Sequence, residues 1–274
     1  MSFTIRSNIA SLNAQRNLFN TNTMQADSFS KLSSGFRITK AGDDAAGLGI
    51  SSNLQAQVRS FNQANRNAQD AQSLIQTAEG NLNQTTELLT RMRELAMQSA
   101  SSGVGNSERG YIQTENTALI TEITRIANAA EYNGTSLLNS ATSLTFQVGI
   151  RDVAANDRIA VSTVDSTATA LGVAALDFSS QAGSQAALAT IDAALNTVSS
   201  SRATFGAAGN RLASVVQTIQ QSSESLSAAN SRIRDVDVAE ETSKLARAQV
   251  MQQAGVSVLS QANQSPQVAL KLLG

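Results

Sequence analysis

The chain of 274 residues contains no cysteine and no histidine. Without cysteine there are no disulfides or thiol nucleophiles, and without histidine there is no imidazole base and no common zinc ligand. Ser-His-Asp and Cys-His catalysis are therefore excluded, and only sites built from carboxylates remain open. We expect the chain not to be an enzyme and to hold no cofactor and no metal.

Charged residues are also scarce, at 15% of the chain against about 25% in ordinary soluble domains. Lys and Arg total 20, Asp and Glu total 21, and no basic run stands out. This balance argues against nucleic acid and against an anionic membrane as partners. Weakly charged surfaces repel identical neighbours little, so the composition would suit a dense homopolymer.

Long hydrophobic runs are missing as well. The amino-terminal region lacks the apolar core of a secretory signal, and no stretch approaches the roughly 18 apolar residues that cross a bilayer. On this evidence alone the chain looks cytosolic. The missing cysteines would equally suit a protein that leaves the cell by a route without oxidative folding.

A seven-residue hydrophobic repeat dominates what is present. One ladder runs without gaps from Leu54 to Ala96 and a second, of equal length, from Ile191 to Ile233. Sustained repeats of this kind predict helical seams, and two equal seams predict an antiparallel bundle. The expected core residues of this rod are Leu54, Phe61, Ile75, Leu82, Leu89, Ile191, Phe205, Leu212 and Ile219.

These ladders predict a mainly α fold with a long, antiparallel, coiled-coil-like rod domain over residues 45–234. Its long helices are expected at about 45–100, 106–130 and 185–233. Apolar and polar residues alternate at about 142–164, which predicts one β-hairpin. Asn133-Gly134 predicts a turn after the second of these helices.

The two ends of the chain, residues 1–44 and 235–274, predict a second layer, separate from the rod. Each carries a thin apolar stripe with seven-residue spacing, and the last turn is rich in leucine. Such stripes need a partner, because isolated helices are marginal in water. We expect the ends to pair and to take part in polymerisation through Ile5, Leu12, Phe19, Leu245, Leu259, Leu270, Leu272 and Leu273.

Several short segments occur in an order that resembles bacterial flagellin, and the resemblance covers both ends and the rod. They include Ser7-Asn8-Ile9-Ala10-Ser11-Leu12-Asn13, Lys31-Leu32-Ser33-Ser34-Gly35-Phe36, Asp43-Asp44-Ala45-Ala46-Gly47-Leu48 and Gln252-Gln253-Ala254-Gly255. The resemblance implies a subunit of the extracellular helical flagellar filament used for motility. It further implies that the paired terminal helices form the inner layer of this filament and that the rod surrounds them. Because the sequence has room only for the hairpin and a loop between the rod helices, it implies a short form without inserted outer domains.

The resemblance also implies partners and a route out of the cell. Expected partners are copies of the chain itself, a flagellar export chaperone, the type III export apparatus, the filament cap and hook-associated proteins. The chain would be exported unfolded, without a cleavable signal peptide. Innate immune receptors that sense flagellin are further expected partners, at Arg91, Leu95 and Glu115. Arg91 and Leu95 are i and i+4 neighbours on one helix, so these residues would first serve lateral contacts between subunits.

Two other functions remain open at this stage. A hook-associated filament-junction protein would share the terminal helices and assemble in a short ring. A secreted coiled-coil adhesin would need a binding module, and the sequence shows none.

Overall fold

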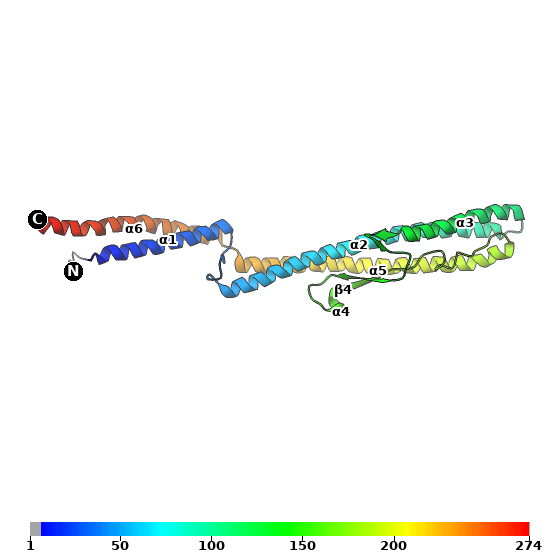
Figure 1. The fold of residues 1–274 in the computed structure, drawn as a ribbon, viewed down its shortest axis with the longest axis horizontal. Helices are drawn as coiled ribbons and strands as arrows, with labels where there is room; N and C mark the ends of the chain where they lie inside the picture. The colour runs from blue at the N-terminus through cyan, green and yellow to red at the C-terminus, as the bar shows by residue number, and fades with distance from the viewer. Residues whose placement is uncertain (1–6, 274) are drawn as a thin grey trace. The chain divides into compact units, whose positions relative to one another are not determined.

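The computed structural model describes the backbone of residues 7–273 and the side chains of residues 7–264. The prediction of a mainly helical chain with long helices is confirmed (Figure 1). None of the helices within residues 7–273 is both long and apolar enough to cross a membrane. In chain order the elements are α1 (Ile9–Ser34), α2 (Ala45–Ser99), α3 (Asn106–Ala129), β1 (Glu131–Tyr132), β2 (Thr135–Ser136), β3 (Ser143–Gln147), α4 (Ala154–Asp157), β4 (Arg158–Ser162), α5 (Gln181–Arg234) and α6 (Val238–Leu273).

The chain forms two compact units. Unit 1 contains Met1–Val58 and Ser225–Gly274, and unit 2 contains Arg59–Glu224. The units therefore divide inside α2 and α5, whereas we expected the domain edges at the ends of these helices, near residues 44 and 235.

Contacts around the connector after α1 explain this difference. Ile38 is buried and packs so closely on Gly47 that a Cβ at Gly47 would lie 2.8 Å from its Cδ1. The Arg37 N–H donates to the Arg234 carbonyl at 2.6 Å. These contacts join the first turns of α2 and the last turns of α5 to unit 1.

Both terminal helices begin or end at residues that satisfy free backbone groups. The Asn8 side chain accepts the Ser11 N–H at 3.0 Å and caps α1. Gly35 ends α1 with a φ of 76°, and its N–H donates to the Lys31 carbonyl. Glycine adopts this left-handed conformation without steric strain. At the start of α6, the Asp237 carboxylate accepts two backbone N–H groups.

The core of unit 2 lies where α2, α3 and α5 run side by side (Figure 1). Among the expected core residues, the structure buries Ile75, Leu82, Leu89, Ile191, Phe205, Leu212 and Ile219. Phe61 is half-buried against this core, and Leu54 is half-buried within unit 1. Small residues of α2 also lie in this core: Ala64, Ala71 and Ala78, spaced seven residues apart, are all buried and let the helices approach closely.

A buried arginine closes the turn between α2 and α3. Arg109 Nε donates to the Ser99 carbonyl at 3.0 Å, and its NH2 donates to the Ser101 carbonyl at 2.9 Å. Ser99 is the last residue of α2, where a cation and a donor are both favourable, and Ser101 lies in the turn just beyond it. Arg109 was not among the residues predicted from the sequence to have a structural role.

Within residues 7–273 the strands form two hairpins, whereas the sequence predicted one. β3 pairs with β4 in the expected region, with Leu144 opposite Val161 and Phe146 opposite Ile159. The second hairpin, β1–β2, has two residues per strand and surrounds Asn133-Gly134. Asn133 and Gly134 have φ values of 48° and 78°, which suit a tight hairpin turn. Strands of two residues are too short to show alternation, so only the turn was predictable.

The segment between β4 and α5 packs into the core of unit 2, although we expected a loop of small residues. Ala168, Val173 and Phe178 are buried there. The Ser99 hydroxyl donates to the Phe178 carbonyl at 2.7 Å and anchors the segment to α2. The irregular spacing of its apolar residues hides this burial from a periodicity argument.

Candidate functional site

Helices α1 and α6 of unit 1 pack as an antiparallel pair (Figure 1). The Ser11 hydroxyl, near the start of α1, donates to Asn263 Oδ1 at 2.8 Å, near the far end of α6. Further along α1, Asn22 Oδ1 accepts from Gln252 Nε2 at 2.9 Å. The two bonds fix both the direction and the register of the pair.

The residues that α1 and α6 turn toward each other recur at alternating spacings of three and four. This is the a/d spacing of a coiled coil. In α1 they are Ser11, Ala14, Leu18, Thr21, Gln25, Ser28 and Leu32, and in α6 they are Glu241, Leu245, Ala248, Gln252, Gly255, Leu259 and Ala262. We call these residues the seam.

The seam is mostly small or polar. Large aliphatic side chains occur at only a few of its positions, and each of these is half-buried. At Gly255 the two helices approach each other closely instead of burying a large side chain, since a Cβ there would lie 3.1 Å from Leu18 Cγ. A seam of this kind fixes geometry but removes little apolar surface from water.

One carboxylate lies inside the seam. Glu241 is 5% exposed. The pKa of Glu241 is lowered, first by the hydrogen bond that the Ser28 hydroxyl donates to its carboxylate, and then by the nearby Lys244 and Lys31. Lys244 Nζ lies 3.4 Å from Glu241 Oε2 and 2.8 Å from an oxygen of Glu240. The ionised form of Glu241 is therefore the one that the pair favours.

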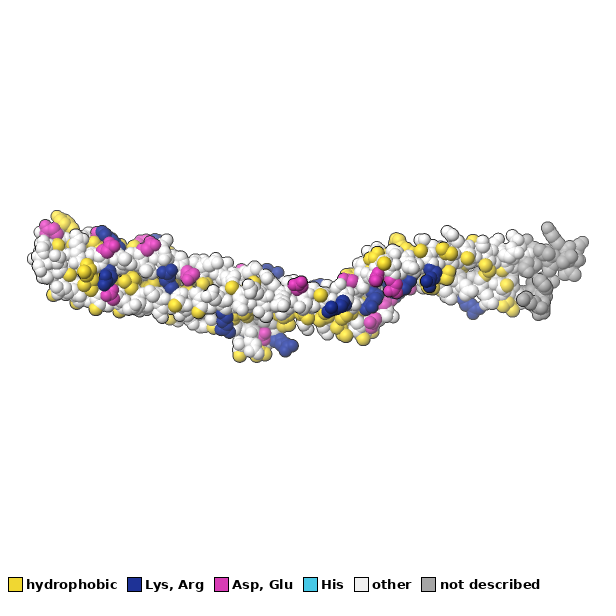
Figure 2. Space-filling model, turned by 180° about the vertical axis from the view of Figure 1, so that it is seen from behind, with side chains coloured by type: hydrophobic (Ala, Val, Ile, Leu, Met, Phe, Trp, Pro, Cys, Tyr) yellow, Lys and Arg dark blue, Asp and Glu magenta, His cyan; other side chains and the backbone are white. Residues whose placement is uncertain are grey.

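Large apolar side chains cover the faces of the pair away from the seam. Leu12 is 58% exposed and Phe19 is 72% exposed, and both lie on α1. In Figure 2, hydrophobic side chains are spread over the α1–α6 pair, to the right of that view. The large exposed hydrophobic residues of the pair are Ile9, Leu12, Phe19, Met24, Phe29, Val238, Val250, Met251, Val256 and Val258. We call them the exposed face.

The expected polymerisation residues thus separate into two groups. Leu12 and Phe19 belong to the exposed face, whereas Leu245 and Leu259 are half-buried in the seam. Ile5 lies outside the described residues. Helix α6 continues through Leu273, but the side chains of Leu270, Leu272 and Leu273 also lie outside the described part of the chain.

The α1 side of the seam was not predictable from a pattern of large apolar residues, because it contains few of them. Ala14, Thr21 and Ser28 are seven residues apart and Ser11 precedes Ala14 by three, which is a/d spacing, but these residues carry almost no hydrophobic signal. A search for small residues at the same spacing would have found them.

The surface expected at Arg91, Leu95 and Glu115 is only partly present. Arg91 Nε donates to Glu115 Oε1 at 2.9 Å, and its NH1 donates to Glu94 Oε2 at 3.0 Å. The Glu115 hydrogen bond is the main cause that raises the pKa of Arg91. Leu95, in contrast, is 2% exposed and packs in the core of unit 2. The expectation that Leu95 lies on this surface is corrected, because its position on α2 faces the helical core.

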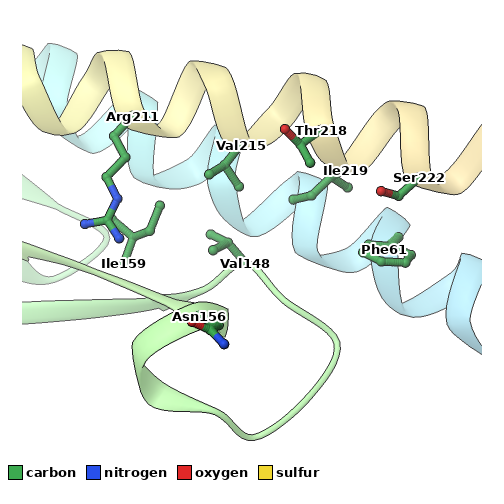
Figure 3. Close-up of a pocket in the computed structure, with 9 residues that line it drawn as sticks. All are labelled: Phe61, Val148, Asn156, Ile159, Arg211, Val215, Thr218, Ile219 and Ser222. Atoms are coloured by element: carbon green, nitrogen blue, oxygen red, sulfur yellow. The ribbon is translucent and has the colours of Figure 1, made fainter.

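A groove lies between the β3–β4 hairpin and the helices of unit 2 (Figure 3). Val148 and Ile159 on the hairpin side point toward Val215 and Ile219 of α5. Its lining includes Arg211 and Asn156 but no carboxylate. Within the described residues, no group of three or more Asp and Glu side chains could hold a metal ion.

Comparison with known proteins identifies both ends of the chain. Residues 5–143 match the model of the bacterial flagellin N-terminal helical region, and residues 188–273 match that of the bacterial flagellin C-terminal helical region. Together the two matches include α1, most of α5, and the described part of α6.

Individual relatives agree with these matches. The chain is 41% identical to a flagellin of Halalkalibacterium halodurans, over 98% of this chain and 99% of that protein. The crystal structure of Bacillus cereus flagellin is similar with a TM-score of 0.51 and 28% identity, covering 56% of this chain and 88% of that one. A putative flagellar hook-associated protein from Vibrio parahaemolyticus is similar with a TM-score of 0.59 and 15% identity, covering 70% of this chain and all of that one.

Proposed function

This chain belongs to the bacterial flagellin family and is a structural subunit of the flagellar filament, and we propose that its α1–α6 pair is the segment through which copies join. The exposure of Leu12 and Phe19 supports this proposal most directly. Large apolar side chains that remain exposed in number on one pair of helices mark an interaction site. In a homopolymer the partner for such a surface is a second copy of the chain.

The composition of the seam supports a coupling between folding of the ends and assembly. Full burial of a large aliphatic side chain contributes about 1.5–3 kcal/mol, and the seam buries its few leucines only partly. Covering Leu12 and Phe19 between copies would add stabilisation that the free chain lacks. Assembly would then order the ends as well as join the subunits.

We retain the division of the filament into layers as part of the proposal. Residues 1–44 and 235–274 would form the inner layer, and residues 45–234 would surround it. The small and polar seam of α1 and α6 supports this, because closely spaced helix axes suit a dense tube.

The filaments that homologous flagellins form are extracellular. We propose that this chain reaches the filament through the type III export apparatus, without a cleavable signal peptide. An export chaperone would cover the exposed face of α6 before export, since Val250, Val256 and Val258 would otherwise favour association. The filament cap and hook-associated proteins would be neighbours at the two ends of the polymer.

The ion pair of Arg91 with Glu115 is proposed as a lateral contact between subunits, and as a contact for innate immune receptors that sense flagellin. Both groups are about half-exposed, so a partner can reach them. Flagellin is a structural family, and we propose no catalytic role, cofactor or metal for this chain.

The alternatives receive no comparable support. The hook-associated structure from Vibrio parahaemolyticus shares the fold at 15% identity, whereas the flagellin relative is 41% identical over nearly the whole chain. An adhesin would need a binding module, whereas the two compact units of this chain are built from the long helices and the hairpins.

Seeded elongation tests the proposed function. Purified chain is added to short filament fragments, and filament length is followed by electron microscopy. We expect growth that continues until the free chain is depleted. Growth that stops after one layer of subunits would instead indicate a junction protein, and no growth would contradict a filament subunit.

A further inference from the structure

The methionines of the chain differ sharply in exposure. The chain contains five methionines. Met92 is fully buried in unit 2, and Met97 is exposed on α2. Met24 of α1 is 53% exposed and Met251 of α6 is 38% exposed, so both lie on the exposed face. Two of the chain's thioethers are thus placed on the proposed contact surface between copies.

Met24 and Met251 occupy equivalent positions on the two helices. Met24 immediately precedes the seam residue Gln25, and Met251 immediately precedes the seam residue Gln252. The backbones of two antiparallel helices are related by an approximate two-fold axis that passes through the seam. Residues at the same heptad position on the two helices therefore lie on the same side of the pair. Both thioethers therefore flank the same side of the seam.

The two methionines also lie at the same level along the pair. The hydrogen bond between Asn22 and Gln252 fixes the register. Met24 follows Asn22 by two residues, and Met251 precedes Gln252 by one residue. Because the helices are antiparallel, both steps lead toward the same end of the pair. At a rise of about 1.5 Å per residue, Met24 and Met251 are level to within one turn of helix.

We propose that Met24 and Met251 form an oxidation site that controls whether a free subunit can join the filament. This inference rests on the proposed function of the α1–α6 pair. The oxidant is a peroxide: one oxygen atom passes from the peroxide to each thioether sulfur, giving a sulfoxide, and hydrogen peroxide is reduced to water. The sulfur loses two electrons, and no carbon–sulfur bond breaks.

Oxidation makes the methionine side chains on this surface polar. A methionine side chain is flexible and apolar, and it adapts well to a contact with another copy. A sulfoxide carries a polar oxygen that would have to be buried without a partner. Once a subunit is assembled, its neighbours cover the pair, so the filament protects these sulfurs whereas the free subunit does not.

The test compares seeded elongation by the full chain before and after hydrogen peroxide treatment, with sulfoxides located by peptide mass spectrometry. We expect oxidation of Met24 and Met251 in the free chain, protection of both in filaments, and a fall in elongation rate of about tenfold or more. Unmodified Met92 serves as the internal sign that unit 2 stays folded, because its side chain is fully buried.

Two variants separate this site from other oxidation, each compared with its own untreated sample. M24L/M251L should lose its sensitivity to peroxide, since leucine has a similar volume and no thioether. M97L should remain as sensitive as the original chain. Normal elongation by a chain oxidised at both positions would overturn the inference, as would equal sensitivity of M24L/M251L. Failure of the untreated chain to elongate would overturn the proposed function, and this inference with it.

Discussion

At the scale of single residues, α1 divides its side chains between two partners. Ser11, Ala14 and Thr21 turn toward α6, whereas Leu12 and Phe19 turn away from it. Small and polar groups permit close approach within one chain, and large apolar groups gain most from burial between chains. The distribution of residue types on one helix therefore supports a separation of intramolecular from intermolecular contacts.

Glu241 makes the stability of the pair depend on pH. Its pKa is lowered in the folded pair by the Ser28 hydroxyl and by Lys244 and Lys31. A carboxylate with a lowered pKa contributes stability that is fully present above its unfolded pKa of about 4.3. That contribution is lost as the pH falls through the lower value of the folded state. We expect the protection of the α6 amides against hydrogen exchange, measured relative to the intrinsic exchange rate at each pH, to fall in this acidic range.

The variant E241Q should remove this part of the pH dependence, and E240Q provides the matched control. Glu240 is exposed and pairs with Lys244 at 2.8 Å, so E240Q should retain the response of the original chain. Equal pH profiles for E241Q and the original chain would show that Glu241 is not the group responsible.

Single residues also show what the sequence could and could not predict. The large apolar residues of the two long ladders, such as Leu82 and Leu212, were predictable because large side chains on the buried face of a helix recur at a regular spacing in the sequence. Leu95 was misplaced, since a resemblance gives a position on a helix but not the face that it presents. Arg109 was not found, because its role depends on carbonyls at the end of α2 that only the fold brings near.

At the scale of elements, α1 and α6 depend on one another. Asn8 Nδ2 donates to the Ala262 carbonyl at 2.9 Å, and Ser11 bonds to Asn263, so the start of α1 holds a late turn of α6. The core of unit 2 is built instead from α2, α3 and α5. The ends can therefore be damaged while the central helices remain folded.

Removal of residues 1–11 tests this independence. The truncated chain loses the Asn8 cap and both bonds to the far part of α6. We expect seeded elongation to be abolished while most of the helical circular dichroism remains, because α2, α3 and α5 are intact. Normal filaments from the truncated chain would show that the start of α1 is dispensable for assembly.

The helices themselves were more predictable than the strands. The expected helices at about 45–100 and 106–130 correspond to α2 and α3, whose periodic patterns continue to their ends. α5 begins at Gln181, earlier than the expected 185, because its first turn is hidden among small residues. The β1–β2 hairpin and the packed segment before α5 lack any repeat and needed the three-dimensional structure.

At the scale of the whole molecule, the two compact units carry different kinds of packing. Unit 2 buries large side chains, including Phe178 and Phe205, within one chain. In unit 1, many large apolar side chains of α1 and α6 remain exposed. A filament subunit needs one part whose apolar core is buried within the single chain and another part whose apolar side chains become buried on assembly. The exposed face thus links the folding of the chain to its polymerisation.

Seeded elongation by F19D and F19L tests this link most directly. Phe19 is 72% exposed in the single chain, so neither substitution should disturb the seam, and circular dichroism of the free chains should agree. Between copies, however, F19D would bury an uncompensated charge. We predict that F19L extends filament seeds at least about tenfold faster than F19D. Equal elongation by the two variants would contradict the assignment of the exposed face as the contact between copies.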